Sequence, residues 1–205
     1  MIPKYHRRIT AHALEEQVSP LALETITLAN LGQDAIRYQF GHAHFHYDDS
    51  SFKAGDAYLD EMRRAVHQSL NQIESIPAWQ AFGRLLHAVQ DFYAHSNYIT
   101  LWREHYPEAT PDQTPPLFAE ALNDPRLHSG RLYYPFEVLS FVPALRGLVL
   151  PWLPHDAHAW MHKDDPSRPD FDFAYAAAVK RTLLEFQIII QALPAAQTSL
   201  FTDRG

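Results

Sequence analysis

Apolar residues recur at intervals of three and four along most of the chain, which is the spacing of one face of an α-helix. The pattern predicts helices over residues 5–17, 21–38, 52–74, 75–106, 117–123, 136–150 and 169–193. Ser19 and Pro20 add a helix start to the second of these, because Ser is a good N-cap and Pro fits the first turn. No pair of alternating strands, repeat or low-complexity tract interrupts the series. We therefore predict one all-α domain over residues 1–205, built as a helical bundle.

The last helix is the most strongly apolar after the central one. Its core side is expected to carry Phe173, Ala176, Ala177, Leu183, Leu184 and Ile188.

Three polar residues lie in register on the central helix, between residues 84 and 106, where neither Gly nor Pro occurs. His87, Asp91 and His95 follow one another at steps of four, and each step drifts by only about 40° around a helix. Leu86 and Phe92 flank the stripe, so it is expected to face the core. A buried carboxylate between imidazoles needs a charged partner, and a divalent cation is the simplest.

Composition limits what that partner can be. The chain has 13 His and no Cys, so a metal must take His, Asp, Glu, main-chain or water ligands. This ligand set suits zinc and tolerates manganese or iron. With 46% hydrophobic and 20% charged residues the chain is globular, and its net charge of −7 disfavours duplex nucleic acid as a partner.

Further ligand candidates lie in four other places. His6 is near the start of the first helix, and Asp34 lies in the second. An irregular segment carries His42, His44, His46, Asp48 and Asp49. A later loop carries His155, His158, His162, Asp164 and Asp165. Each has a simpler interpretation, since Asp48 and Asp49 can cap the next helix and Asp164 and Asp165 can belong to a solvated turn.

The motifs resemble the zinc-dependent phospholipase C superfamily, an all-helical fold shared with certain fungal single-strand nucleases. They are His6-x-x-Ile9-x-x-x-Ala13, His44-Phe-His-Tyr-Asp48, His87-x-x-x-Asp91 with His95, and His158-Ala-Trp-Met-His-Lys-Asp164. The run from Leu86 to Asn97 is most similar to the superfamily's HET-C (heterokaryon incompatibility) branch.

This resemblance implies two or three zinc ions in the bundle core. It assigns Asp34, His44 or His46, His87 and Asp91 to one ion. It assigns His95, His158 and His162 to a second ion, and His6 with a bridging Asp91 to a third. The chain departs from the pattern at its start, where the secreted phospholipases carry a Trp and this chain has Met1-Ile2.

Such a cluster suits phosphodiester hydrolysis, because neighbouring ions can clamp the attacking and leaving oxygens. In this interpretation Asp91 bridges or orients and Asp34 holds the attacking water. The expected enzyme is a phospholipase C. Two alternatives stay open: a single-strand nuclease or nucleotidase with the same cluster, and a non-catalytic toxin or interaction module with a structural metal.

Residues 132–153 form the most apolar stretch, with aromatic residues and only two charges. They are expected either to lie on a bilayer surface, favouring a phospholipid with a zwitterionic headgroup, or to pack in the core. Residues 1–8 are polar and no window of 18 apolar residues occurs, so we expect neither a signal peptide nor a membrane-spanning helix. The default expectation is a cytoplasmic protein, with export by another route as the alternative.

Overall fold

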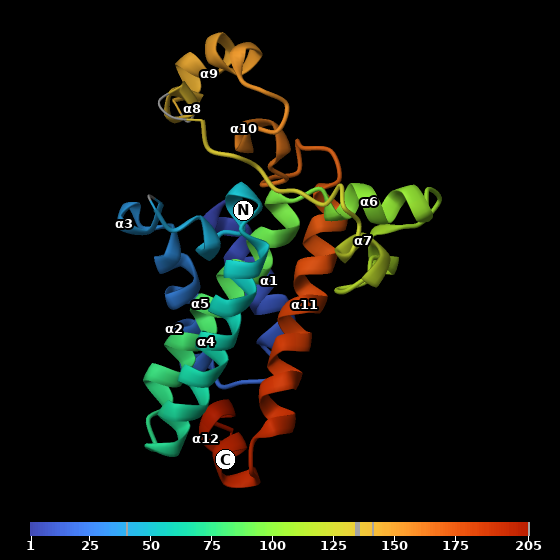
Figure 1. The fold of residues 1–205 in the computed structure, drawn as a ribbon. Coiled ribbons are helices and arrows are strands. Elements are labelled where there is room, and N and C mark those ends of the chain that lie inside the picture. The colour runs from blue at the N-terminus through green and yellow to red at the C-terminus, as the bar shows by residue number, and fades with distance from the viewer. Residues whose placement is uncertain (40, 134–135, 141, 205) are drawn as a thin grey trace.

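The computed structural model describes residues 1–39, 41–133, 136–140 and 142–204, and these residues form an all-α fold (Figure 1). Its bundle consists of α1 (Pro3–Leu14), α2 (Pro20–Leu31), α4 (Phe52–Asn71), α5 (Ser75–His95) and α11 (Phe171–Ala192). Within the described ranges the only β pairings are two isolated bridges. The predicted all-α class is therefore confirmed.

Helix α5 is the centre of the bundle and packs against α2, α4 and α11. Every residue from Leu85 to Ser96 is buried, so this helix is enclosed on all sides near its C-terminal end. Gly83 lets α2 come close, because a Cβ added there would lie 2.2 Å from the Ile26 carbonyl oxygen. This enclosure places the polar residues of α5 in the core.

The predicted helix over residues 75–106 is two helices, α5 and α6 (Tyr98–His105). The chain turns at Ser96 and Asn97, where Ser96 pairs with Ser129 in an isolated bridge and the Asn97 amide donates to the His128 carbonyl. These hydrogen bonds to a distant segment replace the next helical ones. Neither Gly nor Pro marks the break, which is why the sequence pattern did not predict it.

The second predicted helix, over residues 21–38, also divides. Helix α2 ends at Leu31 and is followed by the 3₁₀ turn η1 (Gly32–Asp34) and the short α3 (Ile36–Gln39). Two further 3₁₀ turns, η2 (Ala43–Phe45) and η3 (Asp48–Ser50), shape the irregular histidine-rich segment. Tyr47 and Asp49 adopt positive φ angles of 55° and 53°, so the chain reverses sharply there.

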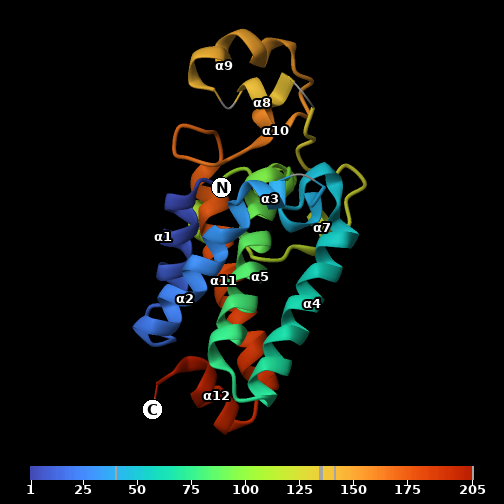
Figure 2. The ribbon, with the colours of Figure 1, turned by 90° about the vertical axis from the view of Figure 1, so that its left-hand side faces the viewer.

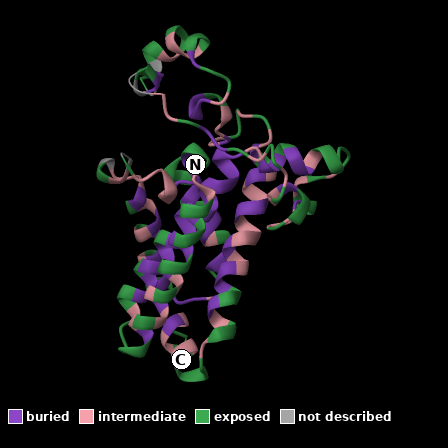
Figure 3. Ribbon diagram, viewed as in Figure 1, coloured by how far each residue is buried: buried purple, intermediate pink, exposed green. Residues whose placement is uncertain are grey.

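A small cap stands at the end of the bundle that carries the N-terminus, as Figures 1 and 2 show from two sides. It consists of α8 (Phe136–Ser140), α9 (Pro143–Val149), η5 (Leu150–Trp152) and α10 (His158–Met161). Glu137 ties α8 to α10, because its carboxylate accepts hydrogen bonds from the amides of Tyr133 and Ala159 at 2.7 and 2.6 Å. Much of α8 and α9 is exposed (Figure 3).

The remaining short elements lie beside or below the bundle. They are η4 (Pro111–Gln113), α7 (Ala119–Leu122) and the C-terminal α12 (Ala195–Thr202). Helix α12 closes the end opposite the cap and was not predicted. None of the described helices is long and apolar enough to cross a membrane.

The predicted core face of α11 is confirmed at Ala177, and Phe173 and Leu183 are partly buried against the core, but the fully buried face is centred elsewhere on the helix. The structure buries Phe171, Ala174, Ala177, Ala178, Thr182, Glu185, Phe186 and Ile189, and Ile188 is 39% exposed. The buried face also includes Glu185, which forms ion pairs with Arg63 and Arg181 at 2.8 and 2.7 Å. A buried ion pair of this kind cannot be recognised from apolar periodicity alone.

Candidate metal centre

The stripe on α5 faces the core as predicted. The exposed fractions of His87, Asp91 and His95 are 0, 1 and 5%. They occupy the C-terminal half of the helix, at the end of the bundle that carries the N-terminus and the cap. Three groups of buried or half-buried His and Asp residues form around them, each with ligand atoms within 4.8 Å of one another.

The first group contains His46, His87 and Asp91, and all three are buried. His87 Nε2 lies 3.0 Å from Asp91 Oδ2 and 3.0 Å from His46 Nδ1, and His46 Nδ1 lies 3.0 Å from Asp91 Oδ2. Two tetrahedral ligand atoms, each about 2 Å from a zinc ion, are roughly 3.3 Å apart. The three atoms are therefore spaced as ligands of a single ion would be.

The second group contains His6, Asp34 and His87. It combines α1, η1 and α5, with Asp34 Oδ1 3.7 Å from His87 Nε2. His6 Nε2 is buried and forms no hydrogen bond within the described ranges, although it lies 3.2 Å from Asp91 Oδ1. A buried ring nitrogen facing carboxylates fits a metal ligand.

Two buried amides orient the imidazoles of the first and second groups. The Gln90 side-chain oxygen lies 2.7 Å from His6 Nδ1, and the Asn30 side-chain oxygen lies 3.2 Å from His87 Nδ1. Because an amide oxygen only accepts, each Nδ1 must carry the proton, which leaves each Nε2 lone pair directed at the carboxylates. Partners of this kind commonly fix the tautomer of metal-binding histidines.

The amides are themselves held in place. Asn30 donates to Gln90 Oε1 at 3.1 Å, and Gln90 donates to the hydroxyls of Thr10 and Thr182 at 3.2 and 3.1 Å. All four of these side chains are buried. The network joins α1, α2, α5 and α11, so the geometry of the ligands depends on the packing of the whole bundle.

The third group contains Asp48, His95 and His158, all buried. His95 Nδ1 lies 3.2 Å from Asp48 Oδ1, and the His95 and His158 rings meet edge to face at a centroid distance of 4.4 Å. Asp164 Oδ1 adds a carboxylate 3.4 Å from His95 Nε2. Gly130 makes room for this group, because a Cβ there would lie 2.6 Å from the His158 Cα.

The electrostatics keep most of the ligand atoms ready to bind a cation near neutral pH. Burial alone would raise the pKa of Asp91, but the Met1 amine and the His87 and His95 imidazoles lower that pKa well below its usual value. Burial lowers the pKa of His87 and of His158 to about 4, which leaves both rings neutral. Neutral imidazoles and ionised carboxylates are the protonation states that bind metals.

His95 behaves differently from the other two rings. Burial lowers its pKa, but the carboxylates of Asp91, Asp48 and Asp164 outweigh this and raise the pKa to about 10. The negative charge that holds a proton on this ring would equally attract a metal ion, which would displace that proton.

Of the nine metal ligands expected from the sequence, the structure brings seven into these groups. They are His6, Asp34, His46, His87, Asp91, His95 and His158. His44 lies instead on η2, with its ring packed 4.4 Å from that of Phe45. His162 lies beside the third group, with Nδ1 3.2 Å from Asp164 Oδ2 and Nε2 3.1 Å from Arg146.

Asp48, a ligand candidate that the family resemblance did not assign to any ion, belongs to the third group. The His44-Phe-His-Tyr-Asp48 motif includes this carboxylate among possible ligands, but a cap of the following helix was an equally simple interpretation of Asp48. The positive φ of Tyr47 directs Asp48 toward α5, and a turn of this kind cannot be read from residue types.

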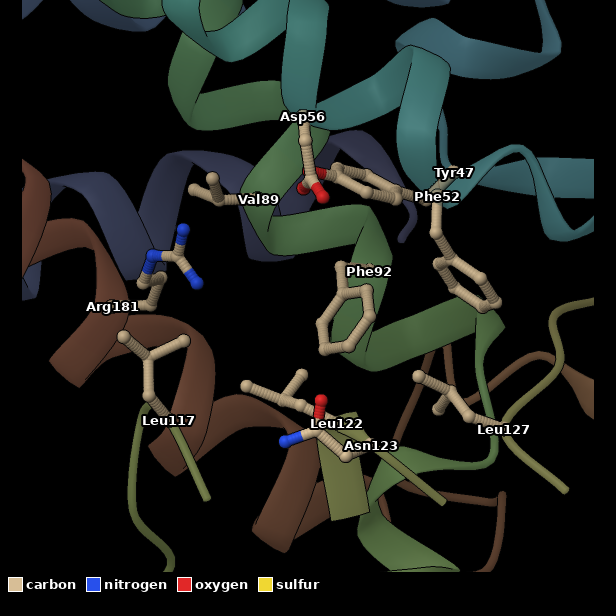
Figure 4. Close-up of a pocket in the computed structure, with 10 residues that line it drawn as sticks. All are labelled: Tyr47, Phe52, Asp56, Val89, Phe92, Leu117, Leu122, Asn123, Leu127 and Arg181. Atoms are coloured by element: carbon tan, nitrogen blue, oxygen red, sulfur yellow. The ribbon is translucent and has the colours of Figure 1, made fainter. Parts of the chain in front are cut away.

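A separate cavity of about 310 Å³ lies against the other side of α5 (Figure 4). Its lining includes Phe52, Phe92, Asp56 and Arg181, but no member of the three groups. Both charged residues already have partners, since Asp56 accepts from the Tyr47 hydroxyl and Arg181 donates to Glu185. The cavity is therefore not part of the candidate metal centre.

Fold and site together define an all-α helical domain with buried His and Asp groups in its core that could hold metal ions. Residues 8–120, more than half of the chain, match the family model of the VWA7 N-terminal domain. The chain belongs to this family. No solved structure matches it.

Curated relatives include von Willebrand factor A domain-containing protein 7 of rat, human and mouse. Each is 32% identical over 80 residues, which is 39% of this chain. The chain spans about 9% of the length of these relatives.

The expected membership of the zinc-dependent phospholipase C superfamily and its HET-C branch is wrong, because the family that matches is the VWA7 N-terminal domain. The motifs behind that expectation consist of His and Asp at helical spacing, which any helical bundle with a buried metal site can share. The matched range holds His46, Asp48, His87, Asp91 and His95, whereas His6 and His158 lie outside it.

Proposed function

We propose that this chain is a metal-dependent phosphodiester hydrolase. The observation that carries the proposal is the position of Asp91 between two sets of imidazoles. Its Oδ2 lies 3.0 Å from both His46 Nδ1 and His87 Nε2, whereas its Oδ1 lies 3.2 Å from His6 Nε2 and 3.8 Å from His95 Nε2. A carboxylate whose two oxygens face different imidazoles could help to hold more than one ion.

The residues fit more than one ion. His87 belongs to two groups, and Asp91 connects them to His95 of the third. His46, His87 and Asp91 would hold one ion, His6 and Asp34 a neighbouring one, and Asp48, His95 and His158 a third. Zinc fits this set, and manganese and iron are compatible with it. When bound, such ions lower the pKa of water and stabilise the charge that develops on a phosphoryl group.

Asp34 and Asp91 have different roles in this proposal. Asp34 is 29% exposed and Asp91 only 1%, so solvent reaches Asp34. The Asp34 carboxylate is therefore the one placed to orient an attacking water and accept its proton. Asp91 stays ionised and holds the imidazoles in place.

The cap favours a phospholipid as the substrate. Leu153, Val149 and Leu150 pack into a small core of the cap, but several other large apolar side chains of residues 136–152 are exposed. These are Phe136, Leu139, Val142, Leu145, Leu148 and Trp152. Trp152 is 85% exposed. Because Glu137 is buried, Arg146 is the one charged side chain at the described surface of α8 and α9. An apolar surface of this kind beside a hydrolytic site suits contact with a bilayer.

The test combines metal analysis with hydrolysis. Purified protein would be assayed by elemental analysis and on bis(p-nitrophenyl) phosphate, phosphatidylcholine vesicles and single-stranded DNA, before and after chelation and zinc return. We expect bound metal, hydrolysis that chelation abolishes and zinc restores, and preference for phosphatidylcholine. Preference for DNA would replace the lipid with a nucleic acid as the substrate. Metal that stabilises the fold without turnover of any substrate would refute the enzymatic proposal.

Variants locate the activity. His87→Ala and Asp91→Asn should each lower metal content and reduce hydrolysis at least 100-fold, because His87 belongs to two groups and Asp91 faces histidines of all three. His67→Ala is the matched control, since His67 lies on α4 outside every group. Full hydrolysis by either ligand variant would contradict the assignment.

A further inference from the structure

A second cavity, of about 290 Å³, opens where the cap meets the bundle. It is lined by Ile2, Ser140, Arg146, His158, Ala159, His162, Asp164 and Asp165. His158 is also a member of the third ligand group, so the cavity leads directly to the candidate metal centre. Its walls come from α8, α9, α10 and the loop that precedes α11.

Arg146 projects into this cavity from α9 and is half-buried. Its Nη2 lies 3.1 Å from His162 Nε2. A guanidinium only donates, so His162 Nε2 must accept, and the ring carries its proton on Nδ1, 3.2 Å from Asp164 Oδ2. Arg146 is thus held in position by a neutral ring.

Arg146 has no anionic partner in the described part of the chain, where no carboxylate lies within ion-pair distance of its guanidinium. The two carboxylates of the cavity are engaged elsewhere, since Asp164 faces His95 and His162, and Asp165 accepts from the Ser167 amide at 2.9 Å.

The neighbouring Arg168 differs from Arg146 because its guanidinium is bound to main-chain carbonyls and has a structural role. It donates to the carbonyls of His162 and Trp160 at 2.9 and 2.5 Å and so fixes the end of α10. Burial and the nearby positive charge of Arg146 lower the pKa of Arg168. The two arginines therefore repel each other, and an anion between Arg146 and the third group would relieve the repulsion.

We propose that Arg146 is the anchor of an anion subsite that binds the non-reacting oxygens of a substrate phosphoryl group. A guanidinium matches phosphate geometry with two parallel hydrogen bonds, and the cavity places that phosphate between Arg146 and the third group. Ile2, which lines the same cavity and is 40% exposed, would contact the apolar part of the molecule. This subsite rests on the proposed function, and it specifies a substrate with one negative charge on phosphorus.

The test measures how charge on the substrate changes the effect of the mutation. Arg146→Ala should raise KM for bis(p-nitrophenyl) phosphate about 10- to 100-fold, the range for a charge-assisted hydrogen-bonded pair, with a smaller change in kcat. KM for a neutral p-nitrophenyl phosphotriester should stay within about twofold of the wild type. Arg146→Lys should recover part of the loss, because Lys keeps the positive charge but cannot donate the two parallel hydrogen bonds of a guanidinium.

Arg64→Ala is the control, because Arg64 is exposed on α4 and its removal changes the net charge equally. It should leave both KM values unchanged. Equal losses on the charged and neutral esters in Arg146→Ala would show a structural role and overturn the subsite.

Binding of inorganic phosphate separates this inference from the hydrolase proposal. Calorimetry with metal-loaded protein should show phosphate binding that Arg146→Ala weakens at least 10-fold, whether or not the protein hydrolyses any ester. Short-chain phosphatidylcholine as the competitor distinguishes a lipid headgroup from free phosphate as the preferred source of the anion. Identical phosphate affinity in the wild type and Arg146→Ala would refute the subsite even if hydrolysis is found.

Discussion

Gly83→Ala is the sharpest test of how the bundle positions the ligands. Gly83 lies on α5 one turn before His87, where α2 crosses closely. A Cβ at this position would lie 2.2 Å from the Ile26 carbonyl oxygen and 2.8 Å from the Ala29 Cβ. Ordinary contact begins near 3.4 Å and the obstructing atom is backbone, so α2 must move away by roughly 1 Å.

The size of the effect follows from three contributions. Overpacking destabilises by about 1–3 kcal/mol, whereas Ala instead of Gly in a helix stabilises by about 1 kcal/mol. The displacement also stretches two hydrogen bonds, each worth about 1 kcal/mol. His87 Nδ1 donates to the Asn30 oxygen at 3.2 Å, and the Asn30 amide donates to Gln90 at 3.1 Å. We expect a net loss of about 2–4 kcal/mol, which lowers Tm by roughly 5–15 °C in a domain of this size.

Thermal and urea unfolding of the metal-loaded protein would measure this loss, and titration with zinc would measure the accompanying change in affinity. We expect zinc affinity to fall about 10-fold or more, since Asn30 orients the His87 ring. Gly147→Ala is the matched control, because no atom lies within 4 Å of a Cβ at Gly147. Wild-type stability in Gly83→Ala, or equal destabilisation in Gly147→Ala, would contradict the prediction that the close α2–α5 contact at Gly83 stabilises the bundle.

Two further predictions concern buried charge. Glu185→Gln should destabilise the protein by about 3 kcal/mol in urea unfolding, because the buried carboxylate pairs with two arginines, whereas exposed Glu24→Gln should change stability by less than about 0.5 kcal/mol. In chelated protein the pKa of His87 and of His158 lies near 4, below the unfolded value of 6.5, so the unfolded chain takes up protons first as the pH falls. The free energy of unfolding should therefore drop between pH 6.5 and 4, by up to about 3 kcal/mol for each of these two rings. His95, whose pKa is raised, contributes almost no pH dependence well below pH 6.5, because it is then protonated in both the folded and the unfolded state. A flat pH profile of Tm over this range would contradict the burial of neutral rings.

The central stripe of the candidate site could be predicted from the sequence because it depends only on local geometry. A step of four residues keeps His87, Asp91 and His95 on one face of any α-helix, and the apolar residues between them decide that this face is buried. The absence of Cys likewise limits the ligands to His, carboxylates, main chain and water, whatever fold the chain adopts.

Residues distant in the sequence were harder to assign. The choice between His44 and His46, and the inclusion of Asp48, depend on two 3₁₀ turns and a positive φ at Tyr47. Alternation along an extended chain would have placed His44 and His46 on the same side, but the turns send His46 into the core and His44 against Phe45. The family was also decided by comparison with known proteins, because His and Asp at helical spacing are not specific to one lineage.

Helix periodicity and residue chemistry act over a few neighbours, so the amino-acid sequence was enough to predict an all-helical chain with a buried stripe of His and Asp residues that could bind metal. The loops that reach that stripe, the helix break after His95 and the burial of Glu185 on α11 became apparent only in the folded domain. The physical reason is that these features come from hydrogen bonds and ion pairs between distant segments. The free energy of such contacts depends on the packing of the whole domain and leaves no periodic signal in the sequence.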